Sequence, residues 1–353
     1  MKKIILYFVL LCFPYMMNAQ TDTTKKEDEF NADEYAATEK IKAFASPKIL
    51  DISPQKLFSI GYDFQTQNQL TAAKVGNDDA EKSTINYNHG LRVNILYPII
   101  SKNNLIVNIA ANYWEHNYDF KNRDDLDNPL SLSLKNGLRN MGLGFTIFKP
   151  LNEKTFLILQ GGANLNGNYK MNNIQPLDYL RYNAAVIYGW KKHERLQFGV
   201  GATRTYLGGA LNYIPIIMYN YTFQDRKWGI EAVFPARVNL RRTINTKSLV
   251  MLGYELEGHT YRLNNQDKET PFPSQFQNVE LRRSEMRLRM TYERQLKGFL
   301  WVSAQAGYRV NWLMNTDQNG DFTRSFFGKK EFLMTNSLTN PFYFNISLNL
   351  VSP

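Results

Sequence analysis

The sequence INYNHGLRVNILY, residues 85–97, decides the fold of this chain. Apolar or aromatic residues and polar residues alternate along it. Successive side chains of a β-strand point to opposite faces, so a period of two separates the two kinds of residue onto two faces. The first face consists of Ile85, Tyr87, His89, Leu91, Val93, Ile95 and Tyr97, and the second of Asn86, Asn88, Gly90, Arg92 and Asn94.

The same alternation resumes after Pro98–Asn104, so Thr84–Tyr113 is predicted to form a β-hairpin. Both strands exceed the usual strand length of about five or six residues, and their polar face carries amides rather than charges. A strand that crosses a bilayer needs about 9–11 residues, with apolar side chains toward lipid and polar ones toward the lumen. The hairpin therefore predicts a transmembrane antiparallel, up-and-down β-barrel.

The amino terminus has the features of a secretory signal peptide, predicted as residues 1–19. Lys2 and Lys3 precede an apolar run, Ile4–Met17, which ends at Asn18-Ala19-Gln20. The only cysteine is Cys12, inside this segment. Lipidation of Cys12 is the alternative interpretation. After cleavage the chain would have no thiol, which excludes disulfides and thiolate metal sites.

Composition narrows the class of protein further. Aromatic residues make up 14% of the chain, and no stretch reaches the roughly 18 apolar residues that a membrane-spanning helix needs. The formal net charge is +10, but its cations do not cluster on a nucleic-acid-binding motif. We therefore expect an exported barrel that binds no nucleic acid.

The chain divides into three predicted parts. After the signal peptide, residues 20–50 are polar and charged and are expected to form a mostly disordered periplasmic extension. Residues 51–353 are predicted to form the barrel.

Alternating segments predict about fourteen strands, with twelve as the alternative. Proline cannot donate to a strand ladder, so Pro235 separates Trp228–Phe234 from the segment that ends at Ile244. Without this separation the count is thirteen, an odd number that is unusual in bacterial barrels. Thirteen predicted strands carry their outward residues within 58–64, 85–97, 105–113, 143–147, 157–165, 182–190, 196–202, 217–223, 228–234, 250–256, 286–292, 300–308 and 342–350, and one more strand lies between Pro235 and Ile244.

Short and long connections alternate along the predicted barrel, as periplasmic turns and outer loops do. The short ones are 98–104, 149–154, 191–195, 224–227 and 295–298, and the long ones are 68–83, 119–135, 263–279 and 313–340. Aromatic residues near the short turns predict an interfacial girdle of Tyr97, Phe148, Phe156, Trp190, Phe223, Trp228, Phe299 and Trp301.

The chain resembles the uncharacterised outer-membrane β-barrels of Bacteroidota-type Gram-negative bacteria. The signal ending Met17-Asn18-Ala19-Gln20 and the aromatic final strand carry this resemblance. The hairpin Ile216–Pro235 and the segment Ala236–Leu240 are similar to one barrel family of unknown function. The resemblance covers roughly residues 50–353 and implies a fold and a location in the cell outer membrane, with no activity to carry over.

Charged residues concentrate on the predicted inward face of two neighbouring strands. Carboxylates and arginines placed on adjacent strands can pair across the ladder. They form either a salt-bridge network that fills the lumen or a constriction that selects solutes by charge. The candidate residues are Arg237, Arg241, Glu255, Glu257, His259, Arg283, Glu285, Arg287, Arg289 and Glu293.

The function predicted first is a pore for passive or weakly anion-selective passage of small polar solutes. The alternative is a non-conducting structural or receptor barrel that acts through loops 119–135, 263–279 and 313–340. A lipid hydrolase is less favoured, because only His89 faces lipid and no serine motif accompanies it. We predict no enzyme activity, no cofactor and no metal site. The expected partners are outer-membrane lipid and lipopolysaccharide, and, during insertion, periplasmic chaperones and the barrel-assembly machinery.

Overall fold

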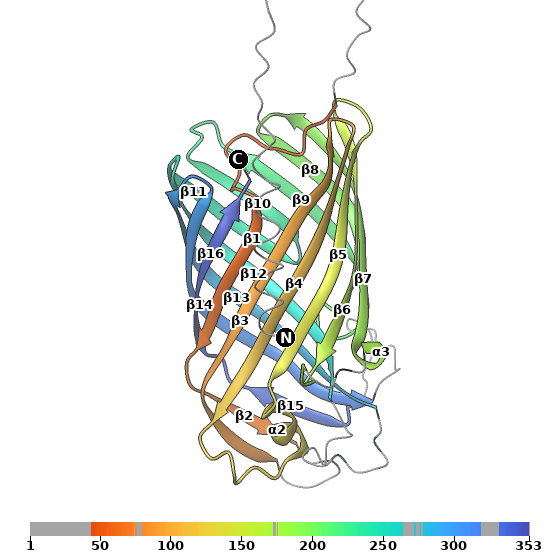
Figure 1. Ribbon diagram of the computed structural model, residues 1–353, viewed down its shortest axis with the longest axis vertical. Helices are drawn as coiled ribbons and strands as arrows, with labels where there is room; N and C mark the ends of the chain where they lie inside the picture. Colours follow the sequence, from red (N-terminus) through yellow and green to blue (C-terminus); the bar gives the residue numbers. More distant parts are fainter. Residues whose placement is uncertain are drawn as a thin grey trace, which may run out of the picture. The chain divides into compact units, whose positions relative to one another are not determined.

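The computed structural model describes residues 44–352 apart from 74, 76–79, 172–173, 175, 264–271, 273–275, 277 and 319–331. Fourteen antiparallel strands close into a barrel (Figure 1). They are β1 (Lys56–Gln65), β3 (Glu81–Lys102), β4 (Leu105–Phe120), β5 (Leu138–Pro150), β6 (Thr155–Gly167), β7 (Leu180–His193), β8 (Leu196–Thr205), β9 (Asn212–Thr222), β10 (Trp228–Phe234), β11 (Arg237–Asn245), β12 (Ser248–Arg262), β13 (Val279–Lys297), β14 (Leu300–Gln318) and β16 (Phe342–Val351).

The barrel closes because β1 pairs with β16 on one side and with β3 on the other. The prediction of fourteen strands is confirmed, and the alternative of twelve is wrong. The separation at Pro235 is confirmed too, since β10 ends at Phe234 and β11 begins at Arg237. None of the helices in the described part of the chain has the length and apolar character needed to cross a membrane.

Alternation of side chains separates an apolar outer face from a mostly polar lumen. β16 shows it most simply, because exposed and buried residues alternate along the whole strand. His89 lies on the outer face as predicted, where its Nδ1 is 2.6 Å from the Tyr62 hydroxyl. The exposed residues of β16 are Phe342, Phe344, Ile346, Leu348 and Leu350, and its buried polar residues include Asn345, Ser347 and Asn349.

Some residues predicted to face outward are buried instead. Ile85 is fully buried because a bulge lies between Ile85 and Tyr87. The extra residue of a bulge moves the side chains beyond it to the opposite face of the strand. Phe148 and Phe156 stack at a centroid distance of 4.9 Å inside the barrel. Trp301 is buried as well. These three aromatics therefore do not belong to the predicted girdle.

The two ends of the barrel differ. One end carries the short turns, and the other carries the longer connections (Figure 1). At the long-loop end β2 (Asn68–Ala72) pairs with β3 and with β15 (Met334–Leu338), and β15 also pairs with β14. Two short helices also belong to this end, α2 (Pro129–Leu134) and α3 (Pro176–Tyr179). The loop predicted at 263–279 lies largely outside the described residues.

The chain enters the barrel through a segment, residues 44–55, that crosses the short-turn end. Ala45 N–H donates to the Asn152 carbonyl, and Leu50 N–H donates to the Glu194 carbonyl, both at 2.9 Å. Ser53 N–H donates to Glu231 inside the barrel at 2.9 Å. The predicted signal peptide and most of the predicted extension lie outside the described residues, whereas residues 44–50 are held against the turns.

Candidate functional site

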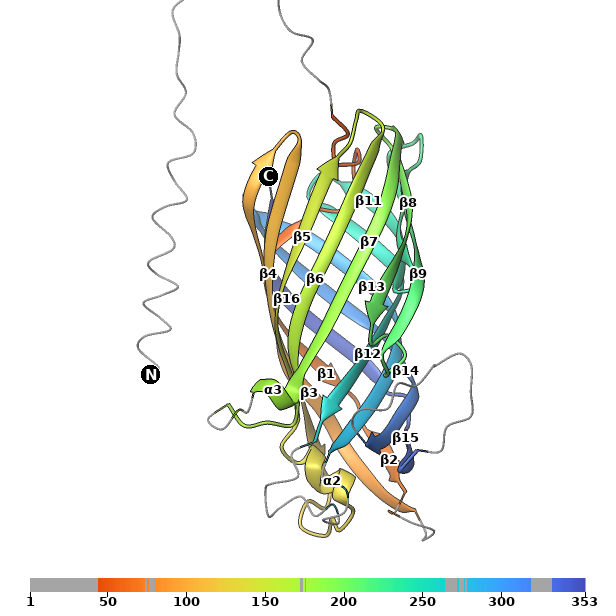
Figure 2. The same ribbon diagram turned by 90° about the vertical axis from the view of Figure 1, so that its right-hand side faces the viewer.

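Three neighbouring strands cross the lumen at the long-loop end. β12 leaves the wall and reaches β6, where Arg262 pairs with Gly167 in parallel (Figure 2). β6 is not a neighbour of β12 in the barrel, because β7–β11 lie between them. β13 remains paired with β12 along its length, and β14 remains paired with β13. We call the crossing parts of these strands, 255–262, 279–287 and 309–318, the ribbon.

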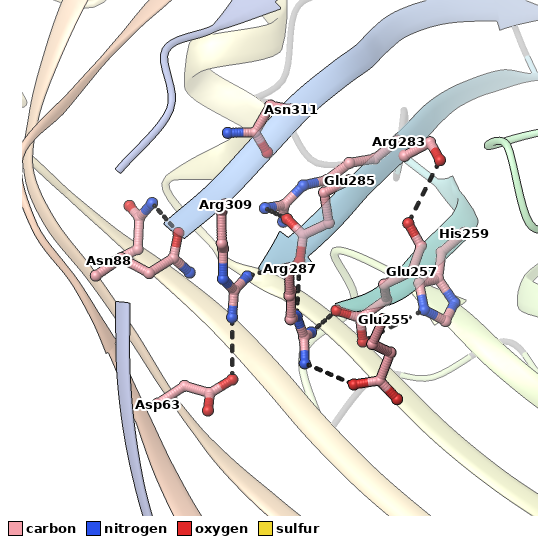
Figure 3. A network of polar contacts seen from close by, with 12 residues as sticks. Asp63, Asn88, Glu255, Glu257, His259, Arg283, Glu285, Arg287, Arg309 and Asn311 are labelled. Carbon is pink, nitrogen blue, oxygen red and sulfur yellow. Dashed lines mark hydrogen bonds and ion pairs between the residues drawn. The ribbon is translucent and has the colours of Figure 1, made fainter. Parts of the chain in front are cut away.

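The ribbon carries a buried charge network centred on Glu285. Arg309 Nη1 and Arg287 Nε lie 2.8 and 3.1 Å from Glu285 Oε1, and Arg283 Nη2 lies 2.7 Å from its Oε2 (Figure 3). Arg309 and Glu285 are 0% and 2% exposed. Charges buried this deeply are tolerated only when they are paired, because each costs several kcal/mol to remove from water.

Two carboxylates of the network face each other directly. Glu257 and Glu285 are register partners on β12 and β13, a placement that is unfavourable for like charges. Arg287 resolves the repulsion because it forms ion pairs with both of them. Glu255, the next inward residue of β12, pairs with Arg289.

Residues from the opposite wall complete the network across the lumen. Arg92 of β3 binds Asp63 and lies 3.3 Å from Glu257. Tyr118 of β4 accepts a hydrogen bond of 3.0 Å from Arg283. The rings of Trp114 and His259 meet edge to face at 4.6 Å. Side chains of β3 and β4 therefore contact side chains of β12 and β13 across the lumen at this level.

An apolar core lies on the long-loop side of the network. It joins residues from the ribbon, the opposite wall, the two short strands and α2 into one cluster of buried side chains. The fully buried members are Leu70, Ala72, Ile85, Leu130, Leu134, Leu138, Leu263, Val279 and Leu281. This core adds a second layer of contacts between the ribbon and the opposite wall.

The lumen on the short-turn side of the network is accessible to solvent. Asn94 of β3, Gln160 of β6 and Asn183 of β7 are inward-facing polar residues, and all three are exposed. We call this part of the lumen the chamber.

Three of the ten predicted residues lie outside the network. Arg241 pairs with Glu231 at 2.8 Å near the short-turn end. Glu293 pairs with Lys56 at 2.6 Å. Arg237 is exposed and forms no ion pair with any described residue. The structure brings together the other seven, which are Glu255, Glu257, His259, Arg283, Glu285, Arg287 and Arg289.

The sequence pattern missed Asp63, Arg92 and Arg309, although each carries a buried ion pair. Each is a solitary charge on the inward face of its strand. Asp63, for example, lies between Gly61 and Gln65 on the inward face of β1. A lone charge inside a membrane barrel needs a partner of opposite charge. Each solitary inward charge therefore indicated an ion pair with another strand.

The arrangement links the ribbon to the opposite wall, but its arginines do not form a ring of unpaired cations. The arginines of the network are divided among Asp63, Glu255, Glu257 and Glu285. In the described residues, no three or more His, Cys, Asp or Glu side chains gather as a metal-ion site.

Comparisons with known proteins give one family and several structures. The model of a family described as a domain of unknown function, DUF6268, matches residues 51–350. No curated protein matches the chain in sequence. An outer membrane channel from Pseudomonas putida F1 is 13% identical, with 87% of this chain and 100% of that chain covered and a TM-score of 0.37.

The toluene transporter TodX from Pseudomonas putida is 8% identical, with 87% and 96% of the two chains covered and a TM-score of 0.33. The β-domain of the Bordetella autotransporter BrkA is 11% identical, with 84% and 100% covered and a TM-score of 0.27.

Proposed function

The chain belongs to the family described as a domain of unknown function, DUF6268, and we propose that it acts as an outer-membrane β-barrel whose lumen is closed to ions at rest. The observation that carries this proposal is the set of contacts that Arg92, Trp114 and Tyr118 make across the lumen with β12 and β13. We call the charge network, together with these contacts across the lumen, the lock.

Placement in a membrane is supported by the outer face of the barrel. Large apolar side chains are exposed on many of its strands, among them Leu143, Ile217, Leu252 and Ile346 at 52–66%. In water such a surface would be unfavourable by roughly 25 cal/mol per Å² of apolar area. Together with the signal peptide predicted at residues 1–19, this face favours the outer membrane, with lipid and lipopolysaccharide as its surroundings.

The contacts across the lumen favour a non-conducting barrel over an open anion-selective pore. Selectivity for anions needs cationic side chains that face a continuous water path. Arg283, Arg287 and Arg309 instead share the carboxylate of Glu285 and are buried. His89, the histidine considered for lipid hydrolysis, faces outward with its Nδ1 beside the Tyr62 hydroxyl, which supports no catalytic role.

Chloride efflux from proteoliposomes tests this function. The mature protein is refolded into phosphatidylcholine vesicles, and its folding is first verified by heat-modifiable migration. We expect efflux no faster than from empty vesicles. Rapid efflux through correctly folded wild-type protein would show an open pore and contradict the lock.

Passage of small polar or anionic solutes is the second candidate function, and the exposed chamber residues Asn94, Gln160 and Asn183 favour it. A solute could enter the chamber from the short-turn side and would cross only when the lock opens. Reversal of both Arg287 and Arg289 to Glu should then make the vesicles leak with a preference for cations. In a purely structural barrel the same variant would lose stability without conducting.

A further inference from the structure

The wall of the barrel is uneven in height, and it is lowest at the β10–β11 hairpin. With a rise of about 3.3 Å per residue and a tilt of about 40°, the strand Trp228–Phe234 climbs about 18 Å, whereas Leu196–Thr205 of β8 climbs about 25 Å. The apolar band of such barrels is about 25 Å tall. The hairpin tip, Pro235-Ala236, therefore ends several ångströms below the outer boundary of that band.

The neighbouring strands continue past this tip and separate. Phe234 is paired with Ile217, and β9 runs on to Asn212. On the other side Arg237 is paired with Glu255, and β12 runs on to Arg262 while it bends toward β6. In the described part of the chain, no strand continues beside β12 in the place of β11. The strand pairing of the wall is thus interrupted between β9 and β12, above the hairpin, and we call this interruption the notch.

A single turn covers this notch. Residues 206–211 connect β8 to β9, and Thr260 Oγ1 donates to the Gly209 carbonyl at 2.8 Å. A Cβ atom built on Gly258 would lie 2.5 Å from the Tyr206 carbonyl oxygen, so the backbone of the turn rests directly on β12. Gly208 and Gly209 adopt φ values of +94° and +82°, which are readily accessible to glycine.

The notch combines an apolar rim with an exposed cation on the chamber side. Phe234 and Tyr213 are 51% and 67% exposed on the outer face. Arg237 directly follows the tip and shares the inward face of β11 with Arg241. Its register partner Glu255 is bound by Arg289, which leaves the guanidinium of Arg237 exposed and without an ion pair among the described residues.

We propose that the notch is a lateral port for amphiphiles with a single anionic headgroup, covered in this structure by the turn 206–211. The apolar chain would lie between β9 and β12 against Phe234 and Tyr213, and the headgroup would bind Arg237 on the chamber side. An arginine binds carboxylate or phosphate through two parallel hydrogen bonds, which suits such a headgroup. The port rests on the membrane placement proposed above, but it does not depend on the lock.

Site-specific photolabelling tests the port. An alkyl phosphate with a diazirine in its chain is added to the mature protein in phosphatidylcholine nanodiscs, and labelled peptides are identified by mass spectrometry. We expect saturable labelling within 206–216 and 234–237 that unlabelled alkyl phosphate displaces. Labelling that does not saturate and spreads over the whole apolar wall would overturn the proposal.

The matched variants are Arg237→Gln and Arg242→Gln. Arg242 is on the same strand but is exposed on the outer face, where its guanidinium lies 5.2 Å from the centre of the Trp228 ring. Loss of the headgroup contact in Arg237→Gln should weaken labelling about tenfold, and Arg242→Gln should label as the wild type does. Equal labelling by the alkyl alcohol of the same chain length would contradict the role of Arg237.

Depth measurements separate a failed port from a failed membrane placement. Single cysteines at Ala236 and Leu252 carry a fluorophore that spin-labelled lipid quenches on contact. Quenching at both sites supports the port. Quenching at Leu252 alone would place the hairpin tip outside the bilayer and reject the port, whereas quenching at neither would reject the membrane placement itself.

Discussion

Single residues set the strength of the lock. Glu285 accepts ion pairs from Arg283, Arg287 and Arg309 while it is almost fully buried. An isolated buried charge is very unfavourable, so the three cations depend on this carboxylate more than it depends on any one of them. The network is therefore expected to respond unequally to the loss of different members.

Replacement of Glu285 by Gln removes the charge that three arginines share. We expect a loss of about 3–5 kcal/mol in the free energy of unfolding, the range seen when one partner of a buried pair is removed. Urea titration followed by the heat-modifiable band measures it. Glu255→Gln is the matched control, because the Glu255 side chain is 30% exposed and its removal should cost much less. Equal losses in the two variants would contradict the central role of Glu285.

Gly258 reports on the contact between the turn and the ribbon. A valine at this position would place its Cβ against the Tyr206 carbonyl and Leu207, and overpacking of this kind costs about 1–3 kcal/mol. Gly258→Val should therefore lower the urea midpoint and increase proteolysis within 206–211. Ala304→Val, on the outer face of β14, should leave both unchanged. A stable, protease-resistant Gly258→Val protein would show that the turn does not rest on β12.

The sequence predicted one half of the site and missed the other. The inward row of β13 and its partners on β12 follow from the period of two, so Arg283, Glu285 and Arg287 could be placed together. Asp63, Arg92 and Arg309 could not be matched to them, because contacts across a lumen depend on the path of the ribbon. That path is not encoded in a local pattern, and the bulge at Ile85 shows how one extra residue reverses a face.

At the scale of the elements, side chains help to attach the segment 44–55 to the short-turn end of the barrel. Arg226 Nε lies 2.7 Å from Asp51, and Thr222 Oγ1 donates to the Leu50 carbonyl at 2.8 Å. The hydrogen bond from Arg226 lowers the pKa of Asp51 below its ordinary value of 3.8. The attachment of the segment should therefore depend on pH at its Asp51 end.

The sign of this dependence follows from the direction of the pKa shift. A carboxylate whose pKa is lowered in the folded state stabilises that state at every pH above its ordinary pKa. This stabilisation is lost as the pH falls through the lowered pKa. Protease accessibility of residues 44–55 should therefore rise when the pH falls below about 3.8. Asp51→Asn should be accessible at neutral pH already, without this transition. An unchanged transition in Asp51→Asn would assign it to another group.

The fourteen strands themselves were predictable because each repeats the same alternation and ends at a turn or a loop. Pro235 separated β10 from β11 for a reason that holds in any sheet. The additional lengths of β3, β13 and β14 were not predictable in the same way. At the long-loop end β3 pairs with β2 and β14 pairs with β15, while β13 and β14 belong to the ribbon. Side chains of all three strands enter an apolar core there rather than facing lipid and lumen.

At the scale of the whole molecule, the barrel changes from a wide ring of fourteen strands into a smaller closed arrangement. β7–β11 end, β12 meets β6, and the charge network lies where the two regions join. The lock, the chamber and the port all follow from this one departure of β12 from the wall. The central claim about the molecule is therefore that β12 leaves the wall and reaches β6.

The distance between the long-loop ends of β6 and β12 tests that claim most directly. In a uniform fourteen-strand barrel, β6 and β12 would be six strands apart around the ring. A strand spacing of about 4.8 Å and a tilt of about 40° then give a distance of roughly 27 Å between them. Spin labels at Leu165 and Arg262 in the refolded protein report this distance, with heat-modifiable migration as the control. Since Arg262 pairs with Gly167, we predict strong dipolar broadening from closely spaced labels. A single population near the uniform-barrel distance would show that the ribbon does not cross the lumen.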